Sequence, residues 1–353
     1  MDDDEELTES VIGFEALYES MEKCRKGVLW KDSVAHYYLH GLEETLKLER
    51  QLKSGAYKAA KPLAFKVMHP KERDIVSIAF RDRVYQRSLN DVVLYPAMTK
   101  SFIYDNCACQ KGKGTDFARD RLKCHLQRYY RKHGPDGYVL QCDIKGYYPN
   151  MRHDVICNVF REKLDDWSYG RVKTVLNEQY EGDIGFNPGS QMVQIAGISA
   201  LDKVDHYIKE RLHIKHYLRY MDDFILIHED ADYLEYCKER IAEKLAGIGF
   251  VLHETKTRVY PLSQGITMLG FTFRLSKTGK VTMLIKSKNV KSERKKLFRL
   301  VQLAKQGRIP KAKADECYAG WRNHASKGTS RKLLITMDAY YNNLWKDGAK
   351  WAY

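Results

Sequence analysis

Two adjacent aspartates interrupt an apolar run in RYMDDFILI, residues 219–227. The runs on either side, IKHYLRY and FILIH, have the pattern of short buried strands, which predicts that Met-Asp-Asp is the turn of a hairpin. An ionised carboxylate withdrawn from water is costly unless positive charge compensates it. The pair Asp222 and Asp223 therefore predicts either a solvated turn or a bound cation.

A third carboxylate, Asp143, ends the apolar run YVLQCD. If both runs are strands of one sheet, their ends bring carboxylates to one edge, where they can hold two divalent metal ions about 3.5–4 Å apart. Such a pair of ions serves phosphoryl transfer. An Asp-Asp pair alone is more typical of a solvated turn, so the metal hypothesis depends on the motifs around it.

The composition is that of a globular, multi-lobed protein. The chain has 353 residues and 44% hydrophobic content, enough for a substantial core. It contains no apolar stretch near twenty residues, and its N-terminus, MDDDEELTES, is acidic, so we expect a cytoplasmic protein without membrane association. The eight cysteines are scattered, which argues against a disulfide framework and fits a reducing compartment.

Positive charge is concentrated at the C-terminus. Residues 286–353 carry 12 Lys and 5 Arg against 5 acidic residues, a net +12 of the overall +14. Clustered cations are typical of a polyanion partner, although a merely solvated face is the alternative. The helical period of residues 292–308 predicts an inward apolar face and an outward basic face: Leu297, Leu300, Val301 and Ala304 against Arg294, Lys295, Arg299 and Lys305.

Periodicity and turn residues predict the remaining elements. The first sixty residues are expected to be helical, a helix over 82–96 is expected to end at Pro96, and strands are expected around FVLHE and MLGFTFRLS. Other expected elements, in chain order, are a strand at 137–150 ended by Pro149 and Asn150, a helix at 153–164, a glycine loop at 181–191, a helix at 192–212, a helix at 234–249 and C-terminal helices broken at Gly307–Pro310 and at KGTS.

The order of motifs resembles the reverse transcriptases. QCDIKGYYPNM, RYMDDF, GFVLHETKT and TMLGFTF resemble their palm motifs, and PKERDIVSIAFRDRVYQRSL and SFIYDNCACQKGKGTDFARDRL resemble fingers segments of prokaryotic members. The resemblance implies an α+β right-hand polymerase architecture with fingers, a palm built on an antiparallel sheet and a helical thumb. The implied division is 1–60 N-terminal helical region, 61–136 fingers, 137–285 palm with a fingers insertion at about 151–188, and 286–353 basic helical thumb.

The resemblance also assigns roles to the acidic residues. Asp143 and Asp222 match the principal ligands of two Mg²⁺ ions, for which Mn²⁺ can substitute, and Asp223 matches an assisting carboxylate. The carbonyl of Ile144 would complete one coordination shell. Tyr148 matches the aromatic residue beneath the sugar that excludes a 2′-OH, which implies selection of deoxynucleotides; the alternative is ordinary core packing.

Three cations match residues that handle phosphates. Lys66 and Arg73 resemble the fingers cations that clamp the incoming triphosphate, with a solvated surface pair as the alternative, and Lys71 could replace Lys66. Lys256 of HETKT resembles the lysine that protonates the leaving pyrophosphate. A purely screening charge is the competing interpretation.

The glycine loop departs from the commonest family pattern. Gly189 and Gln194 keep their spacing, but Pro188 stands where many relatives have Gln, and Val193 replaces the serine before the second glutamine. This loop normally packs against the nascent base pair and template. Gly189 and Gln194 are therefore expected at the nucleotide site, in a loop whose handling of the template is altered.

The match is closest to compact stand-alone bacterial enzymes. These belong either to diversity-generating retroelements or to phage-defence systems, including abortive-infection types, and the altered glycine loop favours the defence group. The expected partners are an RNA template, in particular a cognate noncoding RNA, the DNA product and dNTPs, together with an accessory protein or further copies of the chain. The primer could be RNA, DNA or a protein hydroxyl.

Two other classes stay open. A catalytically silent RNA-binding scaffold is one, and the three aspartates argue against it. A polymerase that copies RNA into RNA is the other, and Tyr148 argues against that.

Overall fold

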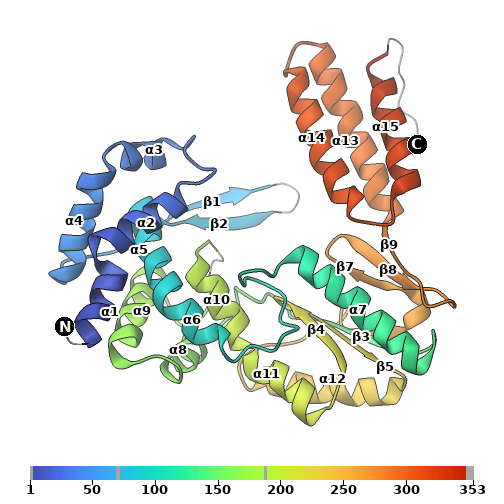
Figure 1. Cartoon of the computed structure of the whole chain (residues 1–353), viewed down its shortest axis with the longest axis horizontal. Helices are drawn as coiled ribbons and strands as arrows, with labels where there is room; N and C mark the ends of the chain where they lie inside the picture. The colour runs from blue at the N-terminus through green and yellow to red at the C-terminus, as the bar shows by residue number, and fades with distance from the viewer. Residues whose placement is uncertain (1–2, 69–71, 187–188, 347–353) are drawn as a thin grey trace.

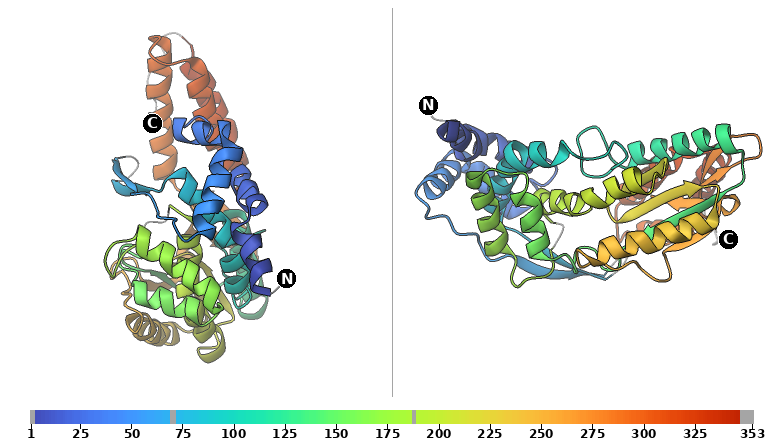
Figure 2. Two further views of the ribbon diagram at one scale, coloured as in Figure 1. Left: turned by 90° about the vertical axis from the view of Figure 1, so that its left-hand side faces the viewer. Right: turned by 90° about the horizontal axis from the view of Figure 1, so that it is seen from below.

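The computed structural model describes residues 3–68, 72–186 and 189–346, so Lys71 and Pro188 lie outside the described residues (Figure 1). The N-terminal helices and the C-terminal helical bundle stand at opposite ends of the molecule, and the four-stranded and three-stranded sheets lie nearer the C-terminal end (Figure 1 and the right-hand view of Figure 2). Within the described part of the chain, no helix is both long enough and apolar enough to cross a membrane.

Four N-terminal helices pack together with α5, which confirms the expected helical character of this region. Their bounds are α1 Asp3–Ile12, α2 Phe14–Cys24, α3 Asp32–Leu39, α4 Gly41–Lys53 and α5 Phe80–Leu89. Val11, Leu17 and Met21 are fully buried and belong to the same core as Leu140 of the central sheet. The N-terminal helices are therefore part of the main body of the protein.

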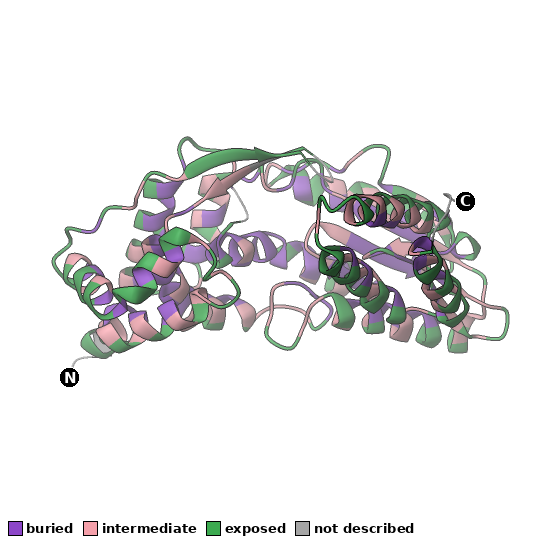
Figure 3. Ribbon diagram, turned by 90° about the horizontal axis from the view of Figure 1, so that it is seen from above, coloured by how far each residue is buried: buried purple, intermediate pink, exposed green. Residues whose placement is uncertain are grey.

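A β-hairpin projects from this helical group toward the C-terminal bundle (Figures 1 and 3). It consists of β1 (Leu63–Val67) and β2 (Arg73–Ser77), and every residue of β1 is exposed. Such a two-stranded ribbon has no apolar layer behind β1 to hold it in place. The hairpin is therefore an arm attached at one end.

The helix after the hairpin is longer than the sequence predicted. After α5 the chain passes through one π-helical turn, η1 (Asn90–Leu94), directly into α6 (Tyr95–Thr99). The prediction that Pro96 ends this helix is wrong. Pro96 comes just after the π-helical turn, and the helix continues past it to Thr99.

The central sheet has four antiparallel strands in the order β4-β5-β3-β6. Its strands are β3 Tyr138–Asp143, β4 His216–Tyr220, β5 Asp223–His228 and β6 Arg258–Pro261. The strand predicted over 137–150 thus ends at Asp143, because residues 145–150 form turns. One face packs on α12 (Ala231–Ala246) and the other on α7 (Thr115–His133), so Leu140 and Val139 enter different cores. Burial on both faces explains why these strands are almost continuously apolar.

Helices fill the segment between β3 and β4. They are α8 His153–Arg161, α9 Asp166–Gln179, α10 Gln191–Ala200 and α11 Asp202–His206, followed by the π-helical turn η2 Tyr207–Arg211. The sequence analysis did not predict α9. The predicted long helix over 192–212 is broken between Ala200 and Asp202. Within α10, Ser190 caps the N-terminus by accepting a hydrogen bond from the Val193 amide.

Two strand predictions after α12 need correction. FVLHE is not a strand: Leu252 makes only an isolated bridge to Ile144, and the pairing strand β6 begins six residues later. MLGFTFRLS is a tight hairpin, with β7 (Ile266–Met268) and β8 (Phe271–Leu275) joined at Leu269 and Gly270. Both joining residues have positive φ, 47° and 86°, a turn signal that the apolar Leu269 concealed.

The C-terminal part is a three-helix bundle attached to a small sheet. β7, β8 and β9 (Val281–Ile285) form that sheet, and α13 (Ser287–Lys305), α14 (Lys311–Ser326) and α15 (Arg331–Leu344) form the bundle. The two predicted breaks in the basic region are confirmed. Leu297, Val301 and Met337 are fully buried in a core that belongs to the bundle alone.

Candidate active site

The predicted acidic hairpin is present, and its turn is tight. Tyr220 of β4 pairs with Asp223 of β5, which leaves only Met221 and Asp222 in the turn. Met221 has φ of 56°, in the left-handed region that non-glycine residues rarely adopt. A residue held in this conformation costs about 1 kcal/mol or more, so its surroundings must stabilise it.

The strand register brings Asp143 to the same edge. Asp143, the last residue of β3, lies directly opposite Asp223 on β5, and residues opposite one another in an antiparallel pair point to the same face. Burial, with repulsion from Asp143, raises the pKa of Asp222 above its ordinary value. Burial and the charges of Asp222 and Asp143 raise the pKa of Asp223 to about 6. The edge therefore holds more negative charge than its surroundings compensate.

One cation lies against this edge. Lys256 Nζ is 2.9 Å from Asp143 Oδ1 and 3.1 Å from Oδ2, and its side chain is 55% exposed. In this state the lysine ammonium screens Asp143, and its exposure leaves it free to move away. The structure thus places Lys256 against Asp143, the carboxylate at the end of β3.

The donors fit a divalent cation, although they are not arranged as a finished cage. Among the described residues, no group of three or more His, Cys, Asp or Glu side chains is set up to hold a metal ion. Carboxylate oxygens are the ligands that Mg²⁺ prefers, and two of these carboxylates are disfavoured as anions by burial. Ile144, whose carbonyl was predicted as a further ligand, directly follows Asp143 and is buried.

A fully buried arginine that the sequence analysis did not single out lies behind the turn. Arg219 Nε is 2.8 Å from Asp205 Oδ1, and Nη2 is 2.6 Å from Oδ2, with both side chains 0% exposed. Arg219 Nη1 donates to the carbonyl of Met221 at 2.9 Å. The only sequence signal was a charged residue one position before the tyrosine of an otherwise buried strand.

Tyr148 lies beside the acidic turn. Its hydroxyl is buried and has no hydrogen-bond partner among the described residues, and the charge of Asp222 contributes to its raised pKa. Burial is the larger cause of that shift. Its ring faces Gly197 of α10, where an added Cβ would lie 3.1 Å from the hydroxyl oxygen. Tyr148 therefore places a buried hydroxyl near the carboxylates.

The glycine loop connects the arm to the turn. A Cβ on Gly189 would lie 3.0 Å from the carbonyl oxygen of Val76 in β2, so the loop backbone approaches the hairpin closely. Gln194, in the first turns of α10, accepts a contact from Cys109 Sγ at 3.7 Å, and the same sulfur lies 3.6 Å from Met221 Sδ. Cys109 is a contact that no sequence motif indicated.

The two predicted phosphate-binding cations lie on the arm. Lys66 is in β1, with Nζ 3.1 Å from Glu72 Oε1 and 62% of its side chain exposed. Arg73 begins β2 and pairs through its backbone with Val67, while its side chain is outside the described part of the structure.

The predicted basic face of α13 is mostly exposed. Lys295, Arg299 and Lys305 are exposed, and Lys305 Nζ donates to the carbonyl of Lys346 at 2.7 Å. Arg294 differs from the expected outward orientation. It is partly buried, its guanidinium lies 5.3 Å from the centre of the Tyr340 ring, and Nε contacts Met337 Sδ at 3.4 Å, because α15 covers this side of α13.

The antiparallel sheets, the surrounding helices and the acidic hairpin define an α+β right-hand polymerase fold. The chain belongs to the reverse transcriptase (RNA-dependent DNA polymerase) family, whose model matches residues 68–273, more than half of its length. Enzymes of this family are RNA-directed DNA polymerases, a class of nucleotidyltransferase, and generally use divalent metal ions.

Two similar solved structures are telomerases. The apo telomerase from Candida tropicalis, truncated from its C-terminal domain, is 15% identical over 69% of this chain and 60% of that chain, with a TM-score of 0.49. The telomerase from Candida albicans, in complex with a TWJ fragment of telomeric RNA, is 12% identical over 74% of this chain and 55% of that chain, with a TM-score of 0.48. The chain thus spans little more than half the length of either. No curated protein matches it significantly.

Proposed function

We propose that the protein is an RNA-templated DNA polymerase that adds deoxynucleotides by two-metal nucleotidyl transfer. The observation that carries this proposal is the register that sets Asp143 opposite Asp223, with Asp222 in the adjoining turn. A solvated turn would leave its carboxylates with ordinary pKa values, whereas burial raises those of Asp222 and Asp223. Such an edge is stabilised by a cation of higher charge than the single ammonium of Lys256.

The chain's own residues have distinct roles in this reaction. Asp143 and Asp222 would hold two Mg²⁺ or Mn²⁺ ions, with Asp223 and the Ile144 carbonyl assisting. When bound, these ions supply activation of the attacking 3′ oxygen and neutralise charge on the leaving pyrophosphate. Lys256 carries an exchangeable proton at the same edge and is the proposed donor to the pyrophosphate.

Nucleotide selection is assigned to Tyr148. Its ring packs against Gly197, so the aromatic face is fixed, and its hydroxyl has no partner among the described residues. A fixed ring beneath the sugar leaves no room for a 2′-OH. Gly189 and Gln194 would contact the nascent base pair, because their loop lies between β2 and the contacts of Met221.

The proposed division into fingers, palm and thumb follows the sequence boundaries. The fingers, 61–136, carry the exposed arm with Lys66 and Arg73, which would close on the triphosphate. The palm, 137–285, carries the carboxylates, with a fingers insertion at about 151–188. The basic bundle, 286–353, would serve as the thumb, and its exposed Lys295, Arg299 and Lys305 would contact phosphates, with Arg294 supporting the helix.

The proposed biological role is in the bacterial cytoplasm, where the enzyme copies a dedicated noncoding RNA as part of a phage-defence system. The altered glycine loop, with Pro188 and Val193, supports this role over that of a diversity-generating retroelement. An accessory protein or further copies of the chain would complete the assembly. Sequencing the RNA and DNA that copurify with the protein tests the role: a repeat matching a variable-protein gene would indicate the retroelement instead.

The activity is tested by separate incorporation assays with deoxy- and ribonucleotides on an RNA template. We expect Mg²⁺-dependent extension with deoxynucleotides and little with ribonucleotides. Extension with ribonucleotides alone would indicate an RNA-copying polymerase. Tight RNA binding without extension in either assay would indicate a silent scaffold.

A further inference from the structure

The buried Arg219 joins three parts of the protein through one side chain. Its guanidinium donates to both carboxylate oxygens of Asp205 on α11, to the Met221 carbonyl in the acidic turn at 2.9 Å, and to the Ile198 carbonyl at 3.0 Å. A guanidinium has five N–H donors in a rigid plane, and four contacts use this geometry. Few side chains could replace it.

The network ends at two backbone carbonyls, those of Ile198 and Met221, and each lies where the backbone needs a donor. Ile198 belongs to the last turn of α10, where helix carbonyls lack intrahelical donors and a positive charge is favourable. The helix breaks at Leu201, and α11 begins at Asp202. Arg219 therefore caps α10, the helix that carries Gln194 at one end and Gly197 against Tyr148.

The turn is the other end of the network. Met221 is held with φ of 56°, so the turn that presents Asp222 needs support from its neighbours. The hydrogen bond from Arg219 Nη1 to the Met221 carbonyl provides this support. Asp205 holds the guanidinium of Arg219 in place. Asp205 is itself held by Tyr217, whose Oη donates to Asp205 Oδ1 at 2.5 Å.

We infer that Arg219 and Asp205 are positioning residues that set the catalytic turn relative to the nucleotide-site helix α10. This inference rests on the proposed function. Neither residue touches substrate: Asp205 orients Arg219, and Arg219 orients the backbone that carries Asp222. A displacement of about 1 Å at a reacting centre can cost about 100-fold in rate, so such a network has a large effect on turnover.

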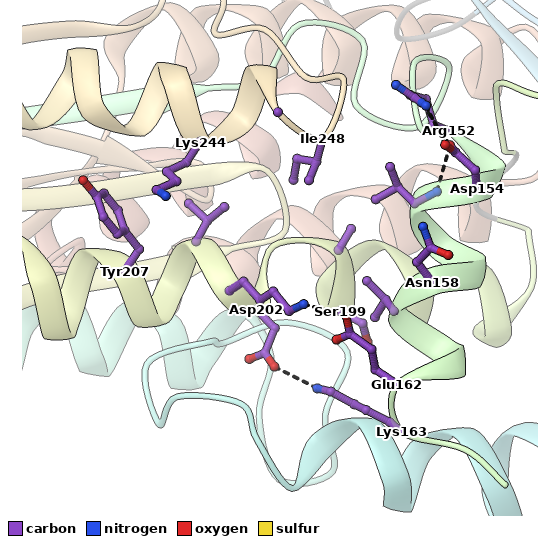
Figure 4. A pocket seen from close by; sticks show the side chains of 16 residues that line it. Arg152, Asp154, Asn158, Glu162, Lys163, Ser199, Asp202, Tyr207, Lys244 and Ile248 are labelled. Carbon is purple, nitrogen blue, oxygen red and sulfur yellow. Dashed lines mark hydrogen bonds and ion pairs between the residues drawn. The ribbon is translucent and has the colours of Figure 1, made fainter.

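The same helix supplies a matched control. Asp202 and Asp205 both lie on α11, are 5% and 0% exposed, and accept charged hydrogen bonds. Asp202 Oδ2 accepts from Lys163 Nζ at 2.8 Å and from Ser101 Oγ at 2.5 Å, on the side of α11 that lines a cavity of about 530 Å³ (Figure 4). Among the described residues, Asp202 contacts Lys163, Ser101 and His206 rather than the turn. Asp202→Asn therefore reproduces the loss of a buried ion pair without touching the network.

The test compares Asp205→Asn, Arg219→Lys and Asp202→Asn in the full chain, each first checked for folding by thermal unfolding. Asp205→Asn keeps the shape and one acceptor, and Arg219→Lys keeps the charge but loses the planar fork. We expect both to lower kcat for single deoxynucleotide addition at least tenfold with KM changed less than threefold. The double variant should be no worse than the more impaired single variant, because both act through one network.

A second readout does not depend on polymerisation. Titration of Mn²⁺ into the protein without substrate, followed by electron paramagnetic resonance, measures binding that Asp222→Asn abolishes. Asp205→Asn and Arg219→Lys should weaken this binding at least fivefold, while Asp202→Asn should leave it and kcat within twofold of wild type. If wild type adds no nucleotide, the proposed function fails and the Mn²⁺ comparison still decides the positioning role.

Two results would overturn the inference. One is that Asp202→Asn and Asp205→Asn lower kcat and Mn²⁺ affinity equally, which is what a purely structural role predicts. The other is that folded Asp205→Asn matches wild type in both readouts. Should Arg219→Lys fail to fold, Asp205→Asn, as the more conservative change, carries the comparison alone.

Discussion

The acidic turn and the C-terminal bundle use charge in opposite ways. At the turn, strand register brings three partly buried carboxylates together, and a network of fully buried side chains supports the backbone that carries them. On α13, Lys295, Arg299 and Lys305 are exposed and lie on a helix whose core contains only residues of the bundle. The first arrangement fixes each charge at one place, and the second spreads charge over a surface.

This difference predicts how each region responds to change. A reaction at a metal-binding edge depends on individual oxygens, so one substitution should remove it. Attraction to a phosphate backbone depends on the number of cations, so single substitutions should matter little and salt should matter much. We therefore expect a site sensitive to single atoms and a surface sensitive to total charge.

The largest expected effect is on the acidic edge. Asp222→Asn should lower DNA synthesis at least 10³-fold, because a lost ligand removes several kcal/mol of transition-state stabilisation. Without metal, its thermal stability should equal or exceed that of wild type, since burial and Asp143 disfavour the charged form of Asp222. Primer extension and thermal unfolding measure the two effects. An Asp222→Asn protein that extends primers well would remove the contrast between the regions.

The next effect concerns the sugar. Tyr148→Val should raise the ratio of ribo- to deoxynucleotide incorporation by about 10- to 100-fold, because a smaller side chain opens space beneath C2′. The matched control is Tyr148→Phe, which keeps the ring and removes only the hydroxyl, for which the described part of the chain offers no hydrogen-bond partner. Its ratio should stay near that of wild type. Equal ratios in all three proteins would place sugar selection elsewhere.

The smallest effect per residue is expected on the bundle. Replacing Lys295, Arg299 and Lys305 together with alanine should weaken binding to different nucleic-acid sequences about equally. The slope of log affinity against log salt should flatten by roughly one unit per lost phosphate contact. Processivity should fall more than single-nucleotide addition.

A matched charge loss tests whether position matters on this surface. Lys173, Lys203 and Lys244 are also exposed, on α9, α11 and α12. Their triple alanine variant should keep the wild-type salt slope. Parallel slopes for wild type and the α13 variant would instead mean that α13 is a solvated helix face.

Much of the site was predictable because it follows local patterns. The apolar run broken by Asp222 and Asp223 predicted a hairpin turn, and the second run ending at Asp143 predicted a sheet edge; both are confirmed. The two breaks in the basic region were marked by Gly307 and by KGTS, and the bundle follows them. In each case neighbouring residues carry the whole signal.

The remainder depends on contacts between distant segments. The pairing of Arg219 with Asp205 requires the break at Leu201 between α10 and α11, and no periodicity in the sequence indicates that break. Arg294 was expected in solvent because its own helix allows that, but α15 covers it. FVLHE has strand-like composition, yet Leu252 meets Ile144 just past the end of β3, where only one bridge can form.

The most direct test of the account is primer extension on a defined RNA template by the purified chain, with each of the four dNTPs and with Mg²⁺ or Mn²⁺ added or chelated. We expect DNA that is complementary to the template, that requires the divalent ion, and that is absent with Asp143→Asn protein of wild-type thermal stability. Equal synthesis by Asp143→Asn, or synthesis that persists after chelation, would contradict the assignment of the acidic edge as the catalytic centre.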